Sequence, residues 1–158
     1  MTNKMIEAKA PENYIINKDR LTIFLAGSIE MGKAENWQDK VKRLLKDEDV
    51  LILNPRRDEW DTTWVQSIDN YKFREQVVWE LDAMDKADKI LMYFDPATKS
   101  PISLLELGLF ADSERLVVVC PEGFWRKGNV DIVCSRYEIK QAKTIEEAIN
   151  ISTLNKKR

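Results

Sequence analysis

Two patterns that decide the fold meet in the stretch Ile90-Leu-Met-Tyr-Phe-Asp-Pro-Ala-Thr-Lys-Ser-Pro-Ile-Ser-Leu-Leu-Glu-Leu-Gly-Leu-Phe-Ala111. Residues 90–94 form a continuous apolar run, which is typical of a strand covered on both faces. Asp95 and Pro96 end this run, and Pro101 opens a second apolar segment with helical spacing. A strand, a loop and a helix in this order predict one unit of a parallel sheet.

The same alternation extends in both directions from this stretch. Further continuous apolar runs occupy residues 21–26, 50–53 and 116–120, and 132–139 is a candidate fifth strand. Helical spacing marks helices through Trp37 to Leu45, Phe73 to Met84 and Ile102 to Leu109, and Thr144 with Glu147 predicts a capping box for a last helix. The sequence therefore predicts an α/β fold: a doubly wound, flavodoxin-like or Rossmann-like parallel sheet of four to five strands with helices on both faces. We expect one domain over residues 1–158, with its core at about 21–150 and polar ends.

The composition excludes several classes of function. Lys and Arg number 25 and Asp and Glu number 27, so the net charge of −2 leaves no basic excess for a nucleic-acid polymer. Histidine is absent, which removes Ser–His and Cys–His hydrolysis and His-ligated zinc. Acid–base chemistry must therefore fall to carboxylates, Lys, Tyr or Cys.

Cysteine usage and hydropathy bear on location. Cys120 and Cys134 form neither a CxxC pair nor a zinc pattern, so we expect reduced thiols inside a cell. Residues 1–13 lack an apolar core of signal length, and no apolar run approaches the ~18 residues of a membrane span. The expected location is the cytoplasm, without membrane attachment.

The ends of the predicted strands locate the site. The runs end in four dipeptides or tripeptides that contain Gly or Pro: Ala26-Gly27-Ser28, Asn54-Pro55, Asp95-Pro96 and Cys120-Pro121. Carboxyl ends of parallel strands lie on one edge of the sheet, and ligands bind outside that edge. The loops that start at residues 27, 55, 96 and 121 are therefore expected to line the site.

Glu106 is the only charged residue in the segment 101–111. A helix that is apolar on nearly every face is a buried helix, and a lone carboxylate there is costly unless it is paired or lies at a cavity. Such a group is a candidate functional residue. The alternative is a capping box, Ser103-x-x-Glu106, but Pro101 favours Ser100 as the cap.

Glu80 breaks a second pattern. It falls on the apolar stripe of Phe73, Val77 and Met84, so it either faces a pocket or forms an ion pair at the edge of the stripe. Arg74 or Lys86 could supply that partner, and the stripe alone leaves both interpretations open.

Two other features have weaker functional interpretations. The segment 27–34 reads GxxxxGK followed by Ala, close to a phosphate-binding loop, but Ala34 lacks the magnesium-binding hydroxyl and Glu30 would repel phosphate. Four aromatic residues near the expected site could stack on a base, pack locally or form a subunit interface: Trp60, Trp64, Phe124 and Trp125.

Three segments together resemble the nucleoside 2-deoxyribosyltransferase superfamily. They are Phe24–Ile29, Glu80–Asp88 and Ser100-Pro-Ile-Ser-Leu-Leu-Glu-Leu-Gly108, and the resemblance runs from about Leu21 to Pro121. This superfamily includes transferases that exchange bases on deoxyribose and hydrolases that cleave nucleoside 5′-monophosphates.

The resemblance implies roles for particular residues. Glu106 takes the position of the nucleophile, and Glu80 that of an acid lining the sugar and base. A serine at the position of Ser100 resembles the monophosphate hydrolases, in which it contacts phosphate. The implied substrate-binding residues are Gly27, Ser28, Ile29, Asp88, Ser100 and Asn129, the last completing the site of a neighbouring subunit.

The implied activity is cleavage of an N-glycosidic bond, with a carboxylate that traps C1′. We expect deoxyribosyl transfer between bases, with 5′-monophosphate hydrolysis as the alternative and a non-catalytic nucleotide-binding protein as the alternative of another class. Neither metal nor organic cofactor is required. The expected partners are a nucleoside or nucleotide and a second copy of the chain in a homodimer or larger homo-oligomer.

Overall fold

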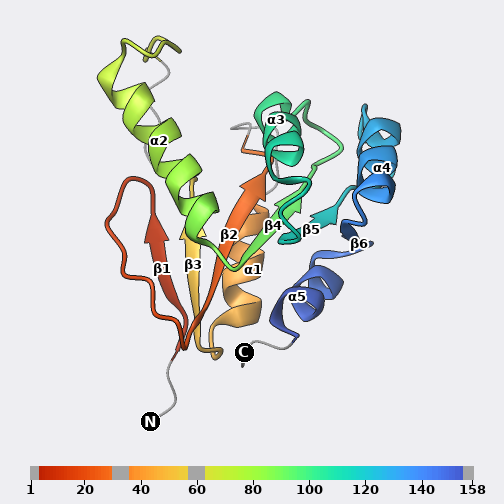
Figure 1. Cartoon of the computed structure of the whole chain (residues 1–158), viewed down its shortest axis with the longest axis horizontal. Helices are drawn as coiled ribbons and strands as arrows, with labels where there is room; N and C mark the ends of the chain where they lie inside the picture. Colours follow the sequence, from red (N-terminus) through yellow and green to blue (C-terminus); the bar gives the residue numbers. More distant parts are fainter. Residues whose placement is uncertain (1–3, 30–35, 57–62, 155–158) are drawn as a thin grey trace.

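The computed structural model of the chain describes residues 4–29, 36–56 and 63–154. Among these residues, six parallel strands form one sheet in the order β1-β3-β2-β4-β5-β6 (Figure 1). The strands are β1 (Ile6–Lys9), β2 (Leu21–Gly27), β3 (Val50–Asn54), β4 (Lys89–Tyr93), β5 (Leu116–Val119) and β6 (Lys140–Ala142). The helices are α1 (Trp37–Leu45), α2 (Tyr71–Lys86), α3 (Pro101–Phe110), α4 (Lys127–Arg136) and α5 (Ile145–Thr153). The doubly wound α/β fold is confirmed, with six strands rather than four to five.

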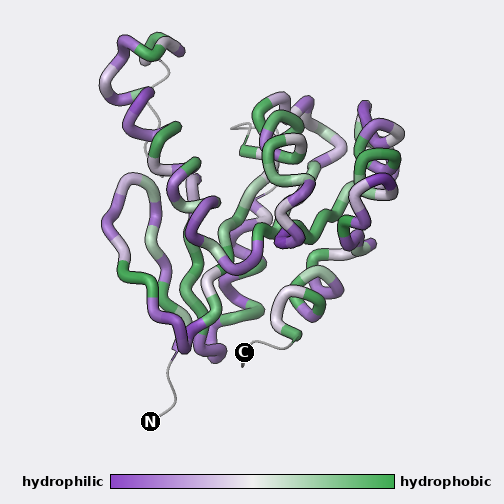
Figure 2. The backbone as a smooth tube through the Cα atoms, in the orientation of Figure 1, coloured by the Kyte–Doolittle hydropathy of each residue, from purple (hydrophilic) through white to green (hydrophobic). Residues whose placement is uncertain are grey.

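The helices cover both faces of the sheet. One apolar cluster joins α2, α3 and α4 to the sheet through residues such as Met84, Leu107 and Val130. A second cluster joins α1 and α5 to the opposite face, with Trp37 and Ile149 among its members. In Figure 2 the central strands are hydrophobic along their length, because they are buried on both sides.

The chain reverses its direction of travel across the sheet at β2. It passes from β2 through α1 to β3 on one side, and then through α2 to β4 on the other side of β2. The carboxyl ends of β2 and β4 therefore flank the switch point of the fold, where ligands of such sheets bind. Figure 1 shows the N-terminal part of α2 extending beyond this edge.

The prediction of a strand at 132–139 was wrong. Those residues belong to the end of α4 and the turn after it, and the strand that pairs with β5 is β6. Val130 and Cys134 are buried four residues apart, whereas Ile132 is exposed, as helical spacing requires. The β-branched pair Ile132 and Val133 had suggested a strand that the helical contacts override.

The helix α3 also differs from expectation, because only one of its faces is buried. Ser103, Glu106, Leu107 and Phe110 face inward. The outer face carries Ile102, Leu105 and Leu109, whose exposed fractions are 61%, 60% and 56%. A helix that is apolar on both faces is thus covered by this chain on one side only.

The capping box at the last helix is confirmed in its main contact. The hydroxyl of Thr144 accepts a hydrogen bond of 3.1 Å from the backbone N–H of Glu147. The Glu147 carboxylate accepts from the N–H of Lys143 at 3.1 Å.

Within the described ranges, no helix is long and apolar enough to cross a membrane.

Candidate active site

The carboxyl ends of β2 and β4 approach each other closely at Gly27. This residue has a φ of +130°, and a β-carbon there would overlap the backbone of Tyr93 on β4. The next residue, Ser28, donates its N–H to the Tyr93 carbonyl over 3.0 Å. Gly27 therefore lets the chain leave β2 directly against the end of β4.

Three buried hydroxyl groups connect the loops after β2 and β4. The Ser28 hydroxyl lies 2.9 Å from that of Thr98 and 2.6 Å from that of Ser100, and the Thr98 and Ser100 oxygens are 2.8 Å apart. The backbone N–H of Asp95 donates to Ser28 Oγ at 2.8 Å. We call Ser28, Thr98 and Ser100 the hydroxyl cluster.

Ser100 occupies the N-cap position of α3 but does not cap it with its side chain. Its backbone has φ 47° and ψ 53°, and the hydroxyl makes no hydrogen bond to the first turn. The expected position is therefore confirmed, whereas the expected capping bond is wrong. The physical reason is that the left-handed backbone turns the hydroxyl toward Ser28 and Thr98.

Two carboxyl groups, on helices α2 and α3, are close enough for the charge of one to affect the other. Glu106 is buried on the inner face of α3, with an exposed fraction of 7%, and burial raises its pKa to about 7. Glu80 on α2 is half-buried. Burial raises the pKa of Glu80 to about 8, the Glu106 charge adds to this rise, and a hydrogen bond with Gln76 opposes it.

Within the described ranges, no cation compensates the negative charge of these two acids. Neither Glu80 nor Glu106 forms an ion pair with a described Lys or Arg, so the expected alternatives Arg74 and Lys86 are not partners of Glu80. Two acids that influence each other titrate as a pair. Near neutral pH, the pair can therefore hold one proton and one negative charge.

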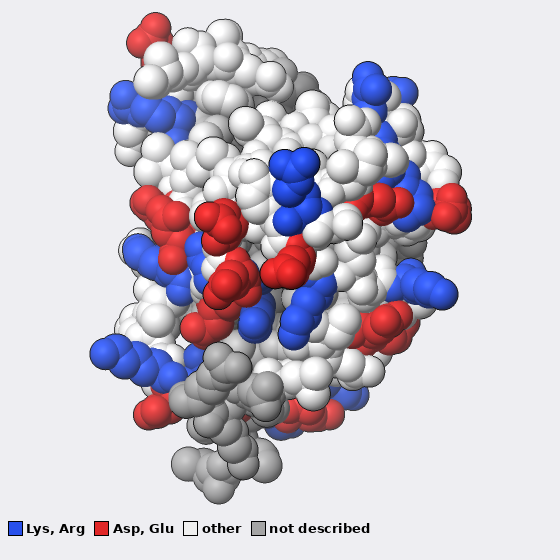
Figure 3. All heavy atoms as spheres, turned by 45° about the vertical axis from the view of Figure 1, so that its right-hand side comes forward, with Lys and Arg blue, Asp and Glu red and all other residues white. Residues whose placement is uncertain are grey.

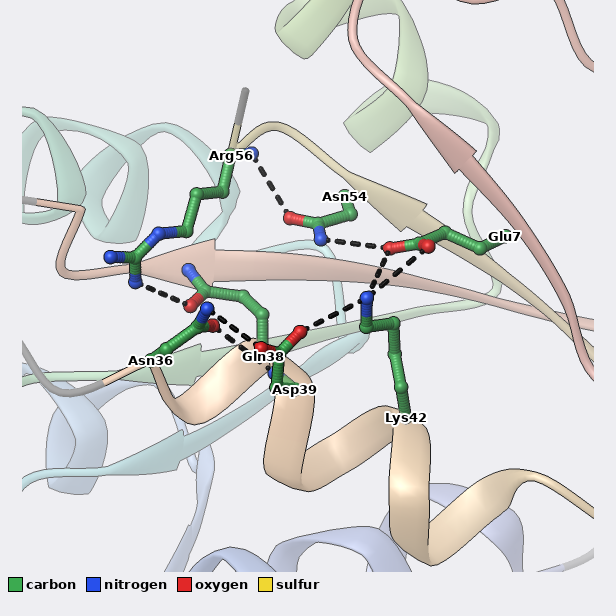
Figure 4. A network of polar contacts seen from close by, with 7 residues as sticks. All are labelled: Glu7, Asn36, Gln38, Asp39, Lys42, Asn54 and Arg56. Atoms are coloured by element: carbon green, nitrogen blue, oxygen red, sulfur yellow. Dashed lines mark hydrogen bonds and ion pairs between the residues drawn. The ribbon is translucent and has the colours of Figure 1, made fainter. Parts of the chain in front are cut away.

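The other side of the same edge carries a fully connected polar network (Figure 4). Lys42 Nζ contacts Glu7 Oε2 at 3.2 Å and Asp39 Oδ1 at 3.0 Å, and Asn54 Nδ2 donates to Glu7 Oε2 at 3.0 Å. Arg56 donates its backbone N–H to Asn54 Oδ1 over 3.0 Å. Every carboxylate in this network has a donor.

Two glutamines extend this network, Gln38 within it and Gln76 toward Glu80, and sequence reasoning missed both. Gln38 Oε1 accepts a 3.1 Å hydrogen bond from Arg56 Nη1. Gln76 Nε2 donates over 3.1 Å to the carbonyl of Pro55, and Gln76 also bonds Glu80. Both glutamines are buried, and Gln38 lies on one helical stripe with Val41 and Leu45, a signal of the same kind as that of Glu80.

Not every expected site residue reaches this edge. Asp88 precedes β4 at its amino end, and its carboxylate accepts the backbone N–H of Thr22 at 2.8 Å. Five residues of strand, roughly 16 Å, separate it from the carboxyl edge, and its bond with Thr22 joins the start of β4 to β2. Asn129 lies exposed in the first turn of α4 rather than in a loop.

The aromatic residues divide between packing and the rim. Phe124 is buried, and its ring centroid lies 4.9 Å from that of Phe94, so it packs locally. Trp125 is half-exposed and donates to the Lys99 carbonyl at 2.8 Å, and both Lys99 and Arg126 lie over its ring. Ile29 is half-buried after Ser28, and Trp64 is half-buried in the segment before α2. Glu30 to Ala34 and Trp60 lie outside the described residues.

Among the described residues, neither the cysteines nor a cluster of acids forms an alternative centre. Both thiols are buried, and burial raises the pKa of Cys120 to about 11 and that of Cys134 to about 12. These values disfavour a thiolate nucleophile at neutral pH. In the part of the chain that the structure describes, no group of three or more Cys, Asp or Glu residues could hold a metal ion. Figure 3 shows cationic and anionic side chains intermixed on the side in view, without a continuous basic patch.

Comparison with known proteins identifies the class to which this fold and this pair of acids belong. A family model described as "Nucleoside 2-deoxyribosyltransferase like" matches residues 20–124. The chain therefore belongs to the nucleoside 2-deoxyribosyltransferase-like family. The match covers both acids and the hydroxyl cluster. A search of curated proteins found no match.

Proposed function

We propose that this chain cleaves the N-glycosidic bond of a 2′-deoxynucleoside and transfers the deoxyribosyl group to another base. The observation that carries the proposal is the pair of acids Glu80 and Glu106, which interact electrostatically, form no ion pair with a described cation and have pKa values raised to about 8 and 7. Two carboxyl groups with different protonation states are the groups that glycosidic bond cleavage requires.

Glu106 acts as the nucleophile in this proposal. Its ionised carboxylate oxygen forms a bond to C1′ while the C1′–N bond breaks and the bonding electrons leave with the base. The protonated Glu80 donates its proton to a nitrogen of the departing base and is left ionised. An incoming base then loses a proton to Glu80 and displaces the Glu106 oxygen, with overall retention at C1′.

The hydroxyl cluster supports a second candidate function. Ser28, Thr98 and Ser100 lie beside the first turn of α3, where backbone N–H groups lack intrahelical acceptors and the helix dipole favours an anion. A 5′-phosphate in this position would make the substrate a nucleoside 5′-monophosphate. Water would then take the place of the acceptor base, and the reaction would be hydrolysis.

One assay separates the candidate functions. The purified chain is incubated with deoxynucleosides or deoxynucleoside 5′-monophosphates, with and without an acceptor base, and products are separated by chromatography. Exchange of the base indicates transfer, whereas free sugar or sugar phosphate indicates hydrolysis. Binding without product identifies a non-catalytic nucleotide-binding protein and contradicts the proposed enzyme.

We also propose that the chain acts as a homo-oligomer. The uncharged outer face of α3, formed by Ile102, Leu105 and Leu109, supports this assembly because a self-complementary apolar face suits a two-fold interface. Leu105→Glu should convert the assembly to monomers in sedimentation experiments, whereas Ile132→Glu on the exposed face of α4 should not. A wild-type chain that is monomeric and fully active would contradict the proposal.

The cytoplasmic location expected from the two reduced cysteines stays a prediction.

A further inference from the structure

The side-chain amide of Gln38 is a buried hydrogen-bond donor without an acceptor. Gln38 is 0% exposed in the first turn of α1, and its Nε2 atom has no hydrogen-bond partner among the residues that the structure describes. Buried N–H groups in folded proteins nearly always have an acceptor, because a buried donor that makes no hydrogen bond lowers stability. An unpartnered donor beside a candidate active site therefore indicates an acceptor that a ligand supplies.

Arg56 determines which end of the amide remains for that ligand. A glutamine can ordinarily rotate its amide and exchange its oxygen with its nitrogen. The guanidinium of Arg56 only donates, so its 3.1 Å bond requires Gln38 Oε1 and leaves Nε2 for the second partner. The backbone of Arg56 is itself held by Asn54, which Glu7 holds in turn. Figure 4 shows the Gln38 amide and the Arg56 guanidinium facing each other.

Contacts on both sides place this amide beside the site. The adjacent Trp37 donates its Nε1–H to the carbonyl of Ser28 at 3.0 Å, and its ring centroid lies 5.6 Å from that of Tyr93. On the other side, the Pro55 carbonyl next to Arg56 accepts from Gln76, which bonds Glu80. Gln38 and Arg56 are thus each the chain neighbour of a residue that contacts the site: Trp37 bonds Ser28 of the hydroxyl cluster, and Pro55 bonds Gln76, the partner of Glu80.

We propose that Gln38 Nε2 donates a hydrogen bond to a carbonyl oxygen of the nucleobase, so that the site selects 6-oxopurines or 4-oxopyrimidines over their amino counterparts. This inference rests on the proposed function. The amino group of adenine or cytosine is a donor at the same position and would meet the donor of Gln38, which Arg56 prevents from turning. A neutral amide suits a neutral carbonyl, whereas an anionic phosphate buried there would need several donors.

The test compares bases that differ only in oxo and amino groups. Dissociation constants of hypoxanthine and adenine, and of uracil and cytosine, are measured calorimetrically with the full chain, and kcat/KM is measured for the four 2′-deoxynucleosides. The wild type should favour at least one oxo base over its amino counterpart by at least about tenfold. Gln38 is 0% exposed, so reaching its amide has a cost that both bases of a pair share.

Two variants at the same position extend the test. Gln38→Met removes both hydrogen-bonding ends and should reduce the preference to within about twofold. Gln38→Glu keeps an acceptor for Arg56, replaces the donor with a second acceptor and should reverse the preference toward the amino base. The matched control is Gln141→Met on the exposed strand β6, which should leave the preference unchanged.

The outcomes distinguish this inference from the proposed function. An oxo preference that is lost in Gln38→Met and reversed in Gln38→Glu supports the inference, even if no nucleoside is cleaved and the proposed function fails. A wild type that cleaves nucleosides but favours amino bases, or does not discriminate, overturns the inference and leaves the function standing. If Gln38→Met does not fold, the wild-type preference and Gln38→Glu still decide.

Discussion

Two groups of charged side chains on different helices differ in how their charges are compensated. In the network around Glu7, the carboxylate has Lys42 and Asn54 as partners. Burial lowers the pKa of Lys42, but its hydrogen bonds to Asp39 and Glu7 raise the pKa by more. The pKa is therefore above its ordinary value, and the lysine stays charged. The acids Glu80 and Glu106 instead have no ion-pair partner among the described residues, and the pKa of each is raised. The compensated group holds β1, β3 and α1 together, whereas the uncompensated pair is the reactive one in the proposed function, at a cost in stability.

The largest effect is expected from removing Glu106, the proposed nucleophile of the uncompensated pair. Glu106→Ala should reduce turnover at least about a thousandfold, because no other described carboxylate occupies its position. The fold should persist, since the change removes a buried charge, and circular dichroism checks this. Asp112→Ala, an exposed acid just beyond α3, is the matched control. Full activity of Glu106→Ala would remove it from the mechanism.

Glu80 should contribute a smaller factor through its proton. The mechanism needs ionised Glu106 and protonated Glu80, so kcat/KM should follow a bell-shaped pH profile with apparent pKa values near 7 and 8 that belong to the pair. Glu80→Gln should lower kcat/KM about a hundredfold and abolish the alkaline limb. Asp85→Asn, exposed on the same helix, should preserve both limbs. An unchanged alkaline limb in Glu80→Gln would assign the proton to another group.

The free energy of unfolding should fall as pH rises because of this pair, whereas a carboxylate in an ion pair would make it rise. The pKa of Glu106 is raised on folding, so its favourable contribution is complete below about pH 4.5 and is lost as pH rises through about 7. Glu106→Gln should therefore match the wild type in thermal unfolding near pH 4 and be more stable at pH 9, by on the order of 2 kcal/mol. An equal difference at both pH values would contradict the raised pKa.

The smallest effect belongs to the compensated network. Lys42→Met leaves the Glu7 carboxylate with one partner fewer and should lower the free energy of unfolding by roughly 1–2 kcal/mol. The control, Lys40→Met, breaks a more exposed pair with Glu146 and should change it by less than about 0.5 kcal/mol. The pH profile of turnover should be unchanged in both variants. A shift of its midpoints in Lys42→Met would show that the two groups of charges are coupled.

The sequence predicts the buried centre of this fold better than its margins. Residues 21–26 and 90–94 are apolar because both faces of their strands are covered, so their pattern is unambiguous. The edge strands β1 and β6 are short and partly exposed, and nothing in their composition distinguishes them from loops. Their pairing depends on contacts with β3 and β5 that no local pattern encodes.

Some residues of the candidate site could likewise be predicted from the sequence, and others could not. The inward direction of Glu106 follows from its place in an apolar helix, and Pro101 locates the start of that helix. The turn of Ser100 toward Ser28 could not be predicted, because it depends on a neighbouring strand end 72 residues away. Gln38 lies on the apolar stripe of its helix and could have been noticed there. Burying a neutral amide costs less than burying a charge, so it is a weaker sign of a functional residue.

Gly27 has a consequence for how variants of this chain will be interpreted. Its positive φ and the closeness of Tyr93 leave no room for any side chain, whatever its chemistry. In a saturation library, position 27 should tolerate glycine alone, and its variants should be lost from the soluble fraction before catalysis is measured. Intolerance at this position will therefore resemble the signature of a catalytic residue. Its origin is the distance between two strands, so abundance has to be measured together with activity before any role in chemistry is assigned to it.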